Sequence, residues 1–129
     1  MVVGVGIDMV EVERLKRALE NPKSGRKFRD RVYTEKEIEY CEGKKRGKYE
    51  SYAGRFAAKE ATMKALGSGW GSRVTWLDIE TLPALGGKPE VCLYHKTSEF
   101  ARELGVQHLS VSITHTKNLA MACVVAHKE

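Results

Sequence analysis

Two carboxylates and a set of basic and hydroxyl side chains stand at positions that suit phosphate chemistry. They fall in three separated segments, residues 6–8, 55–65 and 112–116. Asp8 and Glu60 have mostly apolar neighbours, and cationic or hydroxyl side chains lie close to them in sequence. Carboxylate oxygens can hold a hard divalent cation such as Mg2+, which in turn binds phosphate oxygens. The pattern predicts a metal-assisted site for a phosphate-rich ligand, provided that these segments meet in space.

Length and composition indicate a single folded domain over residues 1–129. The chain is too short for two domains of ordinary size, and an apolar content of 42% with 3 prolines argues against disorder. No stretch approaches the roughly 20 apolar residues of a membrane helix, and the apolar N-terminus has neither the basic residues nor the cleavage site of a signal peptide. Three scattered cysteines, Cys41, Cys92 and Cys123, suit reduced thiols. We expect a soluble, cytoplasmic protein.

The positive charge of the chain is clustered. The net charge is +5, and the basic residues gather in short runs: Arg14, Lys16 and Arg17; Lys23, Arg26, Lys27, Arg29 and Arg31; Lys44, Lys45, Arg46 and Lys48. Such a surface attracts a nucleic acid, a phosphorylated small molecule or an acidic protein. Charge alone does not choose among these partners, and a solvated basic face without a partner is a further alternative.

A strand and a long helix are the elements that must position the carboxylates. Residues 2–8 form an apolar run typical of a central strand, and Gly4, Gly6 and Asp8 share one side of it. Without side chains at the two glycines, another element can approach this strand closely. The longest helix is expected over residues 51–66, with Gly67 as its C-terminal cap. Its many small residues favour close packing against the glycine side of the strand.

The helical spacing places Glu60 on the same side as Phe56, Met63 and Lys64. A carboxylate beside apolar groups must be compensated, either by a metal or by a cation such as Lys64, Arg55 or Lys59. A plain Glu60–Lys64 pair on a wet helix surface is the simpler alternative.

The remaining pattern predicts an α+β protein. Thr34 and Glu37 form a capping box that begins a short helix ending near Cys41. A turn-rich loop is expected at 21–26, a basic loop at 42–48, and chain breaks at Gly69 and Gly71. The other expected elements are a helix at 11–19, strands at 75–82 and 90–94, a helix capped by Thr97 or Ser98 that ends before Gly105, and a hairpin of strands 108–114 and 119–125. His115, at the end of one hairpin strand, suits either a ligand contact or an ordinary position at the edge of the core.

Together the three segments resemble the holo-acyl-carrier-protein synthases, the small 4'-phosphopantetheinyl transferases. The motifs that carry the resemblance are Gly-Ile-Asp at 6–8, Arg-Phe-Ala-Ala-Lys-Glu-Ala at 55–61 followed by Lys-Ala, and Ser-Ile-Thr-His-Thr at 112–116. The resemblance extends over essentially the whole chain, including Arg14, Phe28 and the Gly-Lys-Pro turn at 87–89. It implies a small antiparallel sheet packed with a long central helix and shorter helices.

The resemblance also implies an activity. The phosphopantetheine arm of coenzyme A would pass to a serine of an acyl carrier protein, with release of adenosine 3',5'-bisphosphate, in support of fatty acid biosynthesis. Asp8 and Glu60 are implied as Mg2+ ligands and Glu60, Lys64 and His115 as catalytic residues, while the implied coenzyme A contacts are Arg46, Arg55, Lys64, His115 and Thr116. The general base stays open among Glu60, a metal-bound water and His115.

The partners follow from the same resemblance. Acyl carrier proteins are acidic, so Arg14, Arg17 and the segment 26–29, with Arg26 and Arg29, are the expected docking surface. Homotrimers with active sites between subunits are implied. Two rival functions are a basic nucleic-acid-binding protein, which would not need Asp8 or Glu60, and a metal-dependent phosphohydrolase, which would need no protein acceptor.

Overall fold

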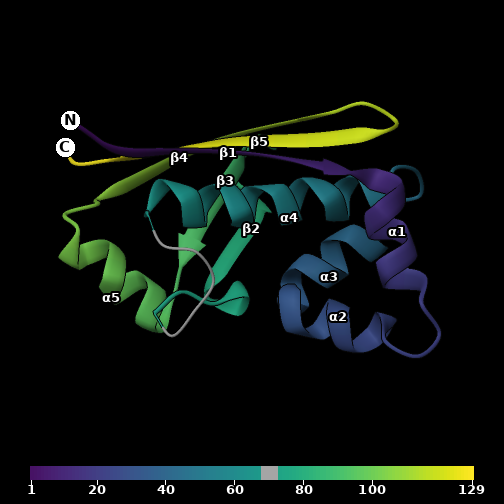
Figure 1. The fold of residues 1–129 in the computed structure, drawn as a ribbon. Coiled ribbons are helices and arrows are strands. Elements are labelled where there is room, and N and C mark those ends of the chain that lie inside the picture. The colour runs from purple at the N-terminus through teal and green to yellow at the C-terminus, as the bar shows by residue number, and fades with distance from the viewer. Residues whose placement is uncertain (68–72) are drawn as a thin grey trace.

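A three-stranded antiparallel sheet and one long helix form the centre of the structure, a computed structural model that describes residues 1–67 and 73–129. The strands are β1 (Val2–Glu11), β4 (His108–His115) and β5 (Leu119–His127), in the spatial order β1-β5-β4. Helix α4 (Lys48–Ala65) lies along one face of this sheet, as Figure 1 shows. The predicted α+β class and the predicted pairing of a long helix with the first strand are both confirmed.

Glycines in β1 let α4 lie directly on the strand. A Cβ atom at Gly6 would stand 1.8 Å from the backbone oxygen of Ala61, and one at Gly4 would stand 1.9 Å from that of Ala65. No side chain fits within such distances, so helix and strand meet backbone to backbone. This contact fixes where Asp8, two residues after Gly6, stands relative to α4.

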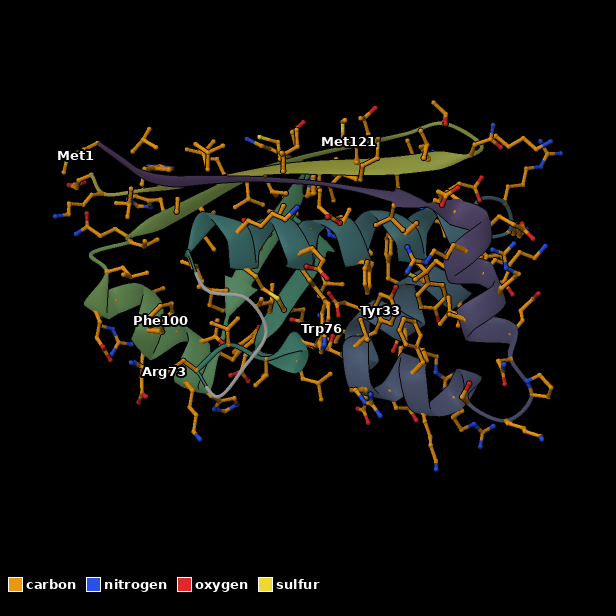
Figure 2. All side chains as sticks on the ribbon, viewed as in Figure 1. Met1, Tyr33, Arg73, Trp76, Phe100 and Met121 are labelled. Atoms are coloured by element: carbon orange, nitrogen blue, oxygen red, sulfur yellow. The ribbon has the colours of Figure 1, made fainter. Side chains whose placement is uncertain are left out.

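Strand β1 is an edge strand, and the expectation of a central strand was wrong. The middle strand is β5, which pairs with both β1 and β4. The apolar side chains of β1 that face away from α4 are open to solvent: Val5 is 58% exposed and Met9 58%. They continue across the register into β5, where Met121 lies on the same side (Figure 2). We call this surface the open face: Val3, Val5, Ile7, Met9, Met121, Cys123 and Val125.

Shorter elements surround the rest of α4 (Figure 1). Helices α1 (Val12–Glu20), α2 (Gly25–Val32) and α3 (Glu35–Glu42) gather at its N-terminal end. The other end carries a two-stranded sheet of β2 (Ile79–Pro83) and β3 (Pro89–Leu93), with the short helix η1 (Trp76–Asp78) before it and α5 (His95–Glu103) after it. No helix among residues 1–67 and 73–129 is long and apolar enough to cross a membrane.

The expected elements compare well with these bounds, with local differences. The capping box is present: Thr34 N donates to Glu37 Oε1 at 2.9 Å, and Glu37 N donates to Thr34 Oγ1 at 3.2 Å. Helix α2 was not predicted, the expected strand at 75–82 begins as η1, and the cap of α5 is Tyr94 rather than Thr97 or Ser98. The breaks expected at Gly69 and Gly71 lie outside the described residues.

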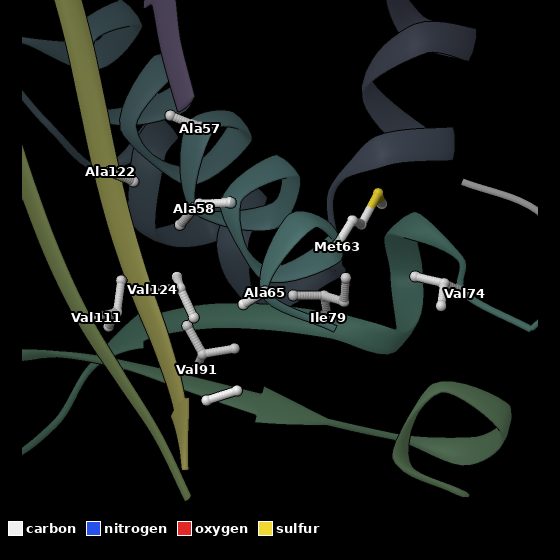
Figure 3. Packing of buried hydrophobic residues seen from close by; sticks show 12 residues of the cluster. Ala57, Ala58, Met63, Ala65, Val74, Ile79, Val91, Val111, Ala122 and Val124 are labelled. Atoms are coloured by element: carbon white, nitrogen blue, oxygen red, sulfur yellow. The ribbon is translucent and has the colours of Figure 1, made fainter. Parts of the chain in front are cut away.

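An apolar core joins α4 to both sheets. Ala57, Ala58 and Met63 of α4 pack there with Ile79, Val91, Val111, Ala122 and Val124, as Figure 3 shows. Met63 is 1% exposed and so belongs to this core. It does not share a functional face with Glu60, as the helical spacing had suggested.

A buried ion pair connects α3 to α4. Lys59 Nζ lies 2.8 Å from Glu37 Oε1, and both side chains are fully buried. The same ammonium donates hydrogen bonds to the backbone oxygens of Trp76, at 2.8 Å, and of Ile79. Burial lowers the pKa of Lys59, and the carboxylate of Glu37 opposes that shift. Lys59 is therefore occupied in the core and does not compensate Glu60, which corrects one of the expectations.

Candidate active site

A cavity of about 570 Å3 lies where β1, α1, α2 and α4 meet. It brings together the two predicted carboxylates, Asp8 from β1 and Glu60 from α4, with Lys64 one helical turn further along. Arg14 of α1 lines the same cavity. Its other walls are largely apolar and comprise Met9, Val10, Leu15, Ala18, Phe28 and Phe56, together with Glu11. The convergence that the sequence predicted is therefore present within one chain.

Lys64 connects the helix to the strand at the floor of the site. Its Nζ lies 3.3 Å from Asp8 Oδ1 and donates to the backbone oxygen of Ile7 at 2.9 Å. Among the described residues, Lys64 forms this ion pair with Asp8 and forms none with Glu60. The simple intrahelical pair between Glu60 and Lys64 is thus not what the structure shows. The lysine side chain is half exposed, so it can turn toward a ligand at small cost.

The electrostatics of Glu60 point to a missing positive charge. Burial raises the pKa of Glu60, the negative charge of Asp8 raises it further, and the ammonium of Lys64 lowers it in part. Two carboxylates thus share one cation, and that cation is hydrogen-bonded at Asp8. A divalent ion between the carboxylates of Asp8 and Glu60 would remove their repulsion and would lower the pKa of Glu60 instead of raising it.

The donor set fits a hard divalent cation that is completed by its ligand. In the part of the chain that the structure describes, no group of three or more His, Cys, Asp or Glu side chains could hold a metal. This excludes a fully protein-coordinated site of that kind among those residues. Mg2+ is usually held by one or two carboxylates and takes its other oxygens from water and phosphates. Asp8 and Glu60 match this second arrangement.

The other predicted contacts lie elsewhere on the chain. Arg46, Arg55, His115 and Thr116 do not line the cavity. Arg55 is on a different side of α4, with its guanidinium carbon 4.4 Å from the ring centre of Tyr40. Arg46 is exposed on the loop before α4, and His115 is exposed at the end of β4. Thr116 stands in the β4–β5 turn, where its Oγ1 accepts from the backbone nitrogens of Asn118 and Leu119.

The aromatic wall of the cavity is a feature that the sequence did not reveal. Phe56 stacks on Trp76 with ring centres 5.1 Å apart, and Phe28 lies 6.3 Å from Phe56. Trp76 is also the residue whose backbone oxygen receives a hydrogen bond from Lys59. The signal that could have found this wall is the i, i+4 spacing of Phe56 and Glu60, but nothing in the sequence indicates the partner rings.

Of the basic residues predicted for docking, Arg14 lines this cavity. Arg14 and Arg17 are exposed on α1, and Arg26 and Lys27 are exposed at the start of α2. These two helices pack against each other. Arg29, also predicted for docking, is only partly exposed, and its Nε lies 3.1 Å from Asp30 Oδ1.

Comparisons with known proteins agree with this geometry. The family model for the 4'-phosphopantetheinyl transferase superfamily matches residues 4–124. A holo-[acyl-carrier-protein] synthase from Ruminiclostridium cellulolyticum is 50% identical over 121 residues, which is 94% of this chain and 89% of that protein.

Two solved structures share the fold. The holo-[acyl-carrier-protein] synthase of Neisseria meningitidis has a TM-score of 0.89 at 33% identity and covers 99% of this chain and 100% of its own. The Helicobacter pylori synthase in complex with coenzyme A has a TM-score of 0.82 at 33% identity, over 95% and 99% of the two chains.

Proposed function

Because this chain belongs to the 4'-phosphopantetheinyl transferase superfamily, we propose that it is a holo-[acyl-carrier-protein] synthase. It transfers the 4'-phosphopantetheine group of coenzyme A to a serine of apo acyl carrier protein and releases adenosine 3',5'-bisphosphate. Relatives of up to 50% identity carry this name, and a similar structure holds coenzyme A. The observation that carries the proposal is the convergence of Asp8, Glu60 and Lys64 in one cavity.

We propose Asp8 and Glu60 as the ligands of Mg2+. When bound, the ion neutralises pyrophosphate oxygens of coenzyme A and stabilises the charge that develops as the serine oxygen attacks phosphorus. Support comes from the shared cavity and from the hard oxygen donors of the two carboxylates. Lys64 would turn from Asp8 toward the phosphates, which is open to it because its side chain is half exposed.

Glu60 is the base candidate that a single chain places in the cavity. Burial and Asp8 raise its pKa, and a bound ion would oppose that rise, so its candidacy as a base rests on its place in the cavity. His115, the alternative, is exposed at the end of β4 and does not line the cavity, so we propose that it acts in a site that another copy completes. Under either assignment the serine loses its proton as its oxygen bonds to phosphorus, and the bridging oxygen leaves with the nucleotide.

We propose a homotrimer whose active sites lie between subunits. The open face supports this assembly, because monomeric proteins seldom leave so continuous an apolar surface in water. Ile7 is 55% exposed on this face and pairs in register with Cys123. We propose that a neighbouring copy supplies His115, Thr116, Arg46 and Arg55 to the Asp8–Glu60 cavity. These four residues are the proposed phosphate contacts that the cavity of one chain lacks.

The proposed protein partner is an acidic acyl carrier protein. Arg14 of α1 lines the cavity, and we propose that Arg17 of α1 and Arg26 and Arg29 of α2 complete the docking surface. A basic surface attracts an acidic partner and speeds encounter. Fatty acid biosynthesis is the proposed process. Three free cysteines fit a reducing compartment, so we propose a cytoplasmic location.

Mass spectrometry tests this function. Apo acyl carrier protein, incubated with the protein, coenzyme A and Mg2+, is expected to gain one phosphopantetheine group. Asp8→Ala is expected to abolish the adduct without unfolding, because the strand keeps its glycine contacts with α4. A phosphohydrolase would release nucleotide without modifying the carrier, and a nucleic-acid-binding protein would leave coenzyme A intact, so either result would overturn the proposal.

A further inference from the structure

Arg55 is a buried cation without an acidic partner. Its residue is 8% exposed, and its Nε atom is buried without a hydrogen-bond partner. Among the described residues no carboxylate forms an ion pair with it. The chain does satisfy its other buried cation, because Lys59 is paired with Glu37. An unpaired buried charge is costly, so the guanidinium of Arg55 is poised for a negative group that comes from outside the described chain.

The ring of Tyr40 takes the place of the missing carboxylate. The guanidinium carbon of Arg55 lies 4.4 Å from the ring centre, and Lys44 Nζ lies 4.8 Å from the same centre. An aromatic face attracts a cation through its quadrupole and carries no net charge. It therefore holds both cations and leaves their full charge for a ligand, whereas an aspartate or glutamate at this position would neutralise one of them.

Tyr40 is itself held in place. It lies on α3, one turn after Glu37, whose carboxylate is bound by Lys59 and by the backbone nitrogens of Thr34 and Thr81. The helix that carries the ring is thus anchored at its start by the capping box and in its middle by the core. A ring on such a helix can orient a flexible arginine without moving with it.

We propose that Tyr40 is a positioning residue that holds Arg55 and Lys44 ready for a phosphate group of coenzyme A, an inference that rests on the proposed function. The ring touches neither the reacting atoms nor the ion at Asp8 and Glu60, because none of Tyr40, Arg55 and Lys44 lines that cavity. Tyr40 would raise the affinity for coenzyme A and leave the chemical step unchanged.

Steady-state kinetics with variants of the full-length protein test this role. Tyr40→Leu is expected to raise KM for coenzyme A roughly five- to thirty-fold with kcat within twofold, from the usual strength of a partly buried cation–ring contact. Tyr40→Phe keeps the ring and should match the unmodified protein. Tyr94→Leu is the matched control, because Tyr94 bonds Glu80 through its hydroxyl and lies after β3; it should leave KM unchanged. An unchanged KM for coenzyme A in Tyr40→Leu would overturn the inference. If the unmodified protein showed no transfer to the carrier protein at all, the proposed function itself would be wrong.

A double variant shows whether Tyr40 acts through Arg55. In an Arg55→Gln background, Tyr40→Leu should change KM by less than twofold, because the cation that the ring orients is gone. A further increase as large as in the unmodified background would contradict the role. NMR of the unmodified protein supplies an independent measurement that does not depend on how the variants fold. The Arg55 Nε–H signal should shift when adenosine 3',5'-bisphosphate binds, and a signal that stays fixed at saturation would refute the assignment.

Discussion

Mixing two defective variants tests whether the active site is shared between subunits. Asp8 and Glu60 line the cavity of one chain, whereas His115 is exposed at the end of β4 and does not line it. If His115 of one copy completes the cavity of the next, Asp8→Ala and His115→Ala remove different halves of the same site. Each variant alone is expected to be nearly inactive, because every site in its trimer lacks one half.

The recovery on mixing can be worked out from this geometry. In trimers assembled at random from equal amounts of the two variants, a site is whole only when the copy that supplies the cavity has Asp8 and its neighbour has His115. Each condition holds half the time, so about a quarter of the sites, and of the full activity, should return in a closed ring. Co-expression with two different affinity tags and purification over both removes the two homotrimers, which have no whole site. Each remaining mixed trimer has one whole site in three, so the purified sample should have about a third of the full activity.

A second pair of variants is the control for this experiment. Asp8 and Glu60 line the same cavity, so mixing Asp8→Ala with Glu60→Ala leaves every cavity defective and should restore nothing. The rate of carrier-protein modification is the assay in both cases. An Asp8→Ala and His115→Ala mixture no more active than the mean of its components would refute the shared site.

Three further predictions concern stability and docking. Glu60→Gln should raise the melting temperature of the metal-free protein by roughly 1–3 °C at neutral pH and have no effect at low pH. Because the pKa of Glu60 is raised in the folded state, the ionised carboxylate destabilises the fold as pH rises through that raised value. A lower melting temperature of the variant at neutral pH would contradict this reasoning. Gly6→Ala should lower the free energy of unfolding, measured with denaturant, by about 3 kcal/mol or more because its Cβ would collide with the backbone of α4. The control Gly43→Ala should change that free energy by no more than about 0.5 kcal/mol, and equal effects of the two substitutions would contradict the close packing. Arg14→Glu should lower kcat/KM for the carrier protein about tenfold or more and weaken its dependence on salt, and an unchanged salt dependence would exclude Arg14 from the docking surface.

The central packing was predictable because its signals are local and steric. Gly4 and Gly6 on one side of β1, with the small residues of α4, indicated a close contact that the structure confirms. The capping box of Thr34 and Glu37 was also read from spacing alone. Local patterns of this kind predict structure well because few other arrangements form hydrogen bonds with the same backbone groups.

The misplaced strand has a physical cause. Strand β1 is apolar on both sides, which normally indicates a central strand, but here its outer residues lie on the open face. The same pattern arises when a second copy covers an edge strand, and a single sequence cannot distinguish the two cases. Helix α2 was missed because it is short and has two large apolar residues, Phe28 and Val32, whose i, i+4 spacing is too small a sample to establish a helical period from sequence.

Within the candidate site, the sequence identified the charged residues but not their partners. Lys64 was expected either to pair with Glu60 or to face a ligand, and the structure places it against Asp8, far away in the sequence. Lys59 was a possible partner for Glu60 and instead fills the core with Glu37. Which of several nearby charges meet is decided by packing between distant segments, and residue spacing does not encode it.

Binding of Mn2+, used as a paramagnetic substitute for Mg2+, tests the central claim most directly. Loss of the free-ion signal in electron paramagnetic resonance counts the ions bound to the protein in the presence of coenzyme A. The unmodified chain should bind one ion per subunit, and Asp8→Asn and Glu60→Gln should each weaken that binding about tenfold or more. Equal binding by all three proteins would show that Asp8 and Glu60 do not hold the ion, and the proposed site would be wrong.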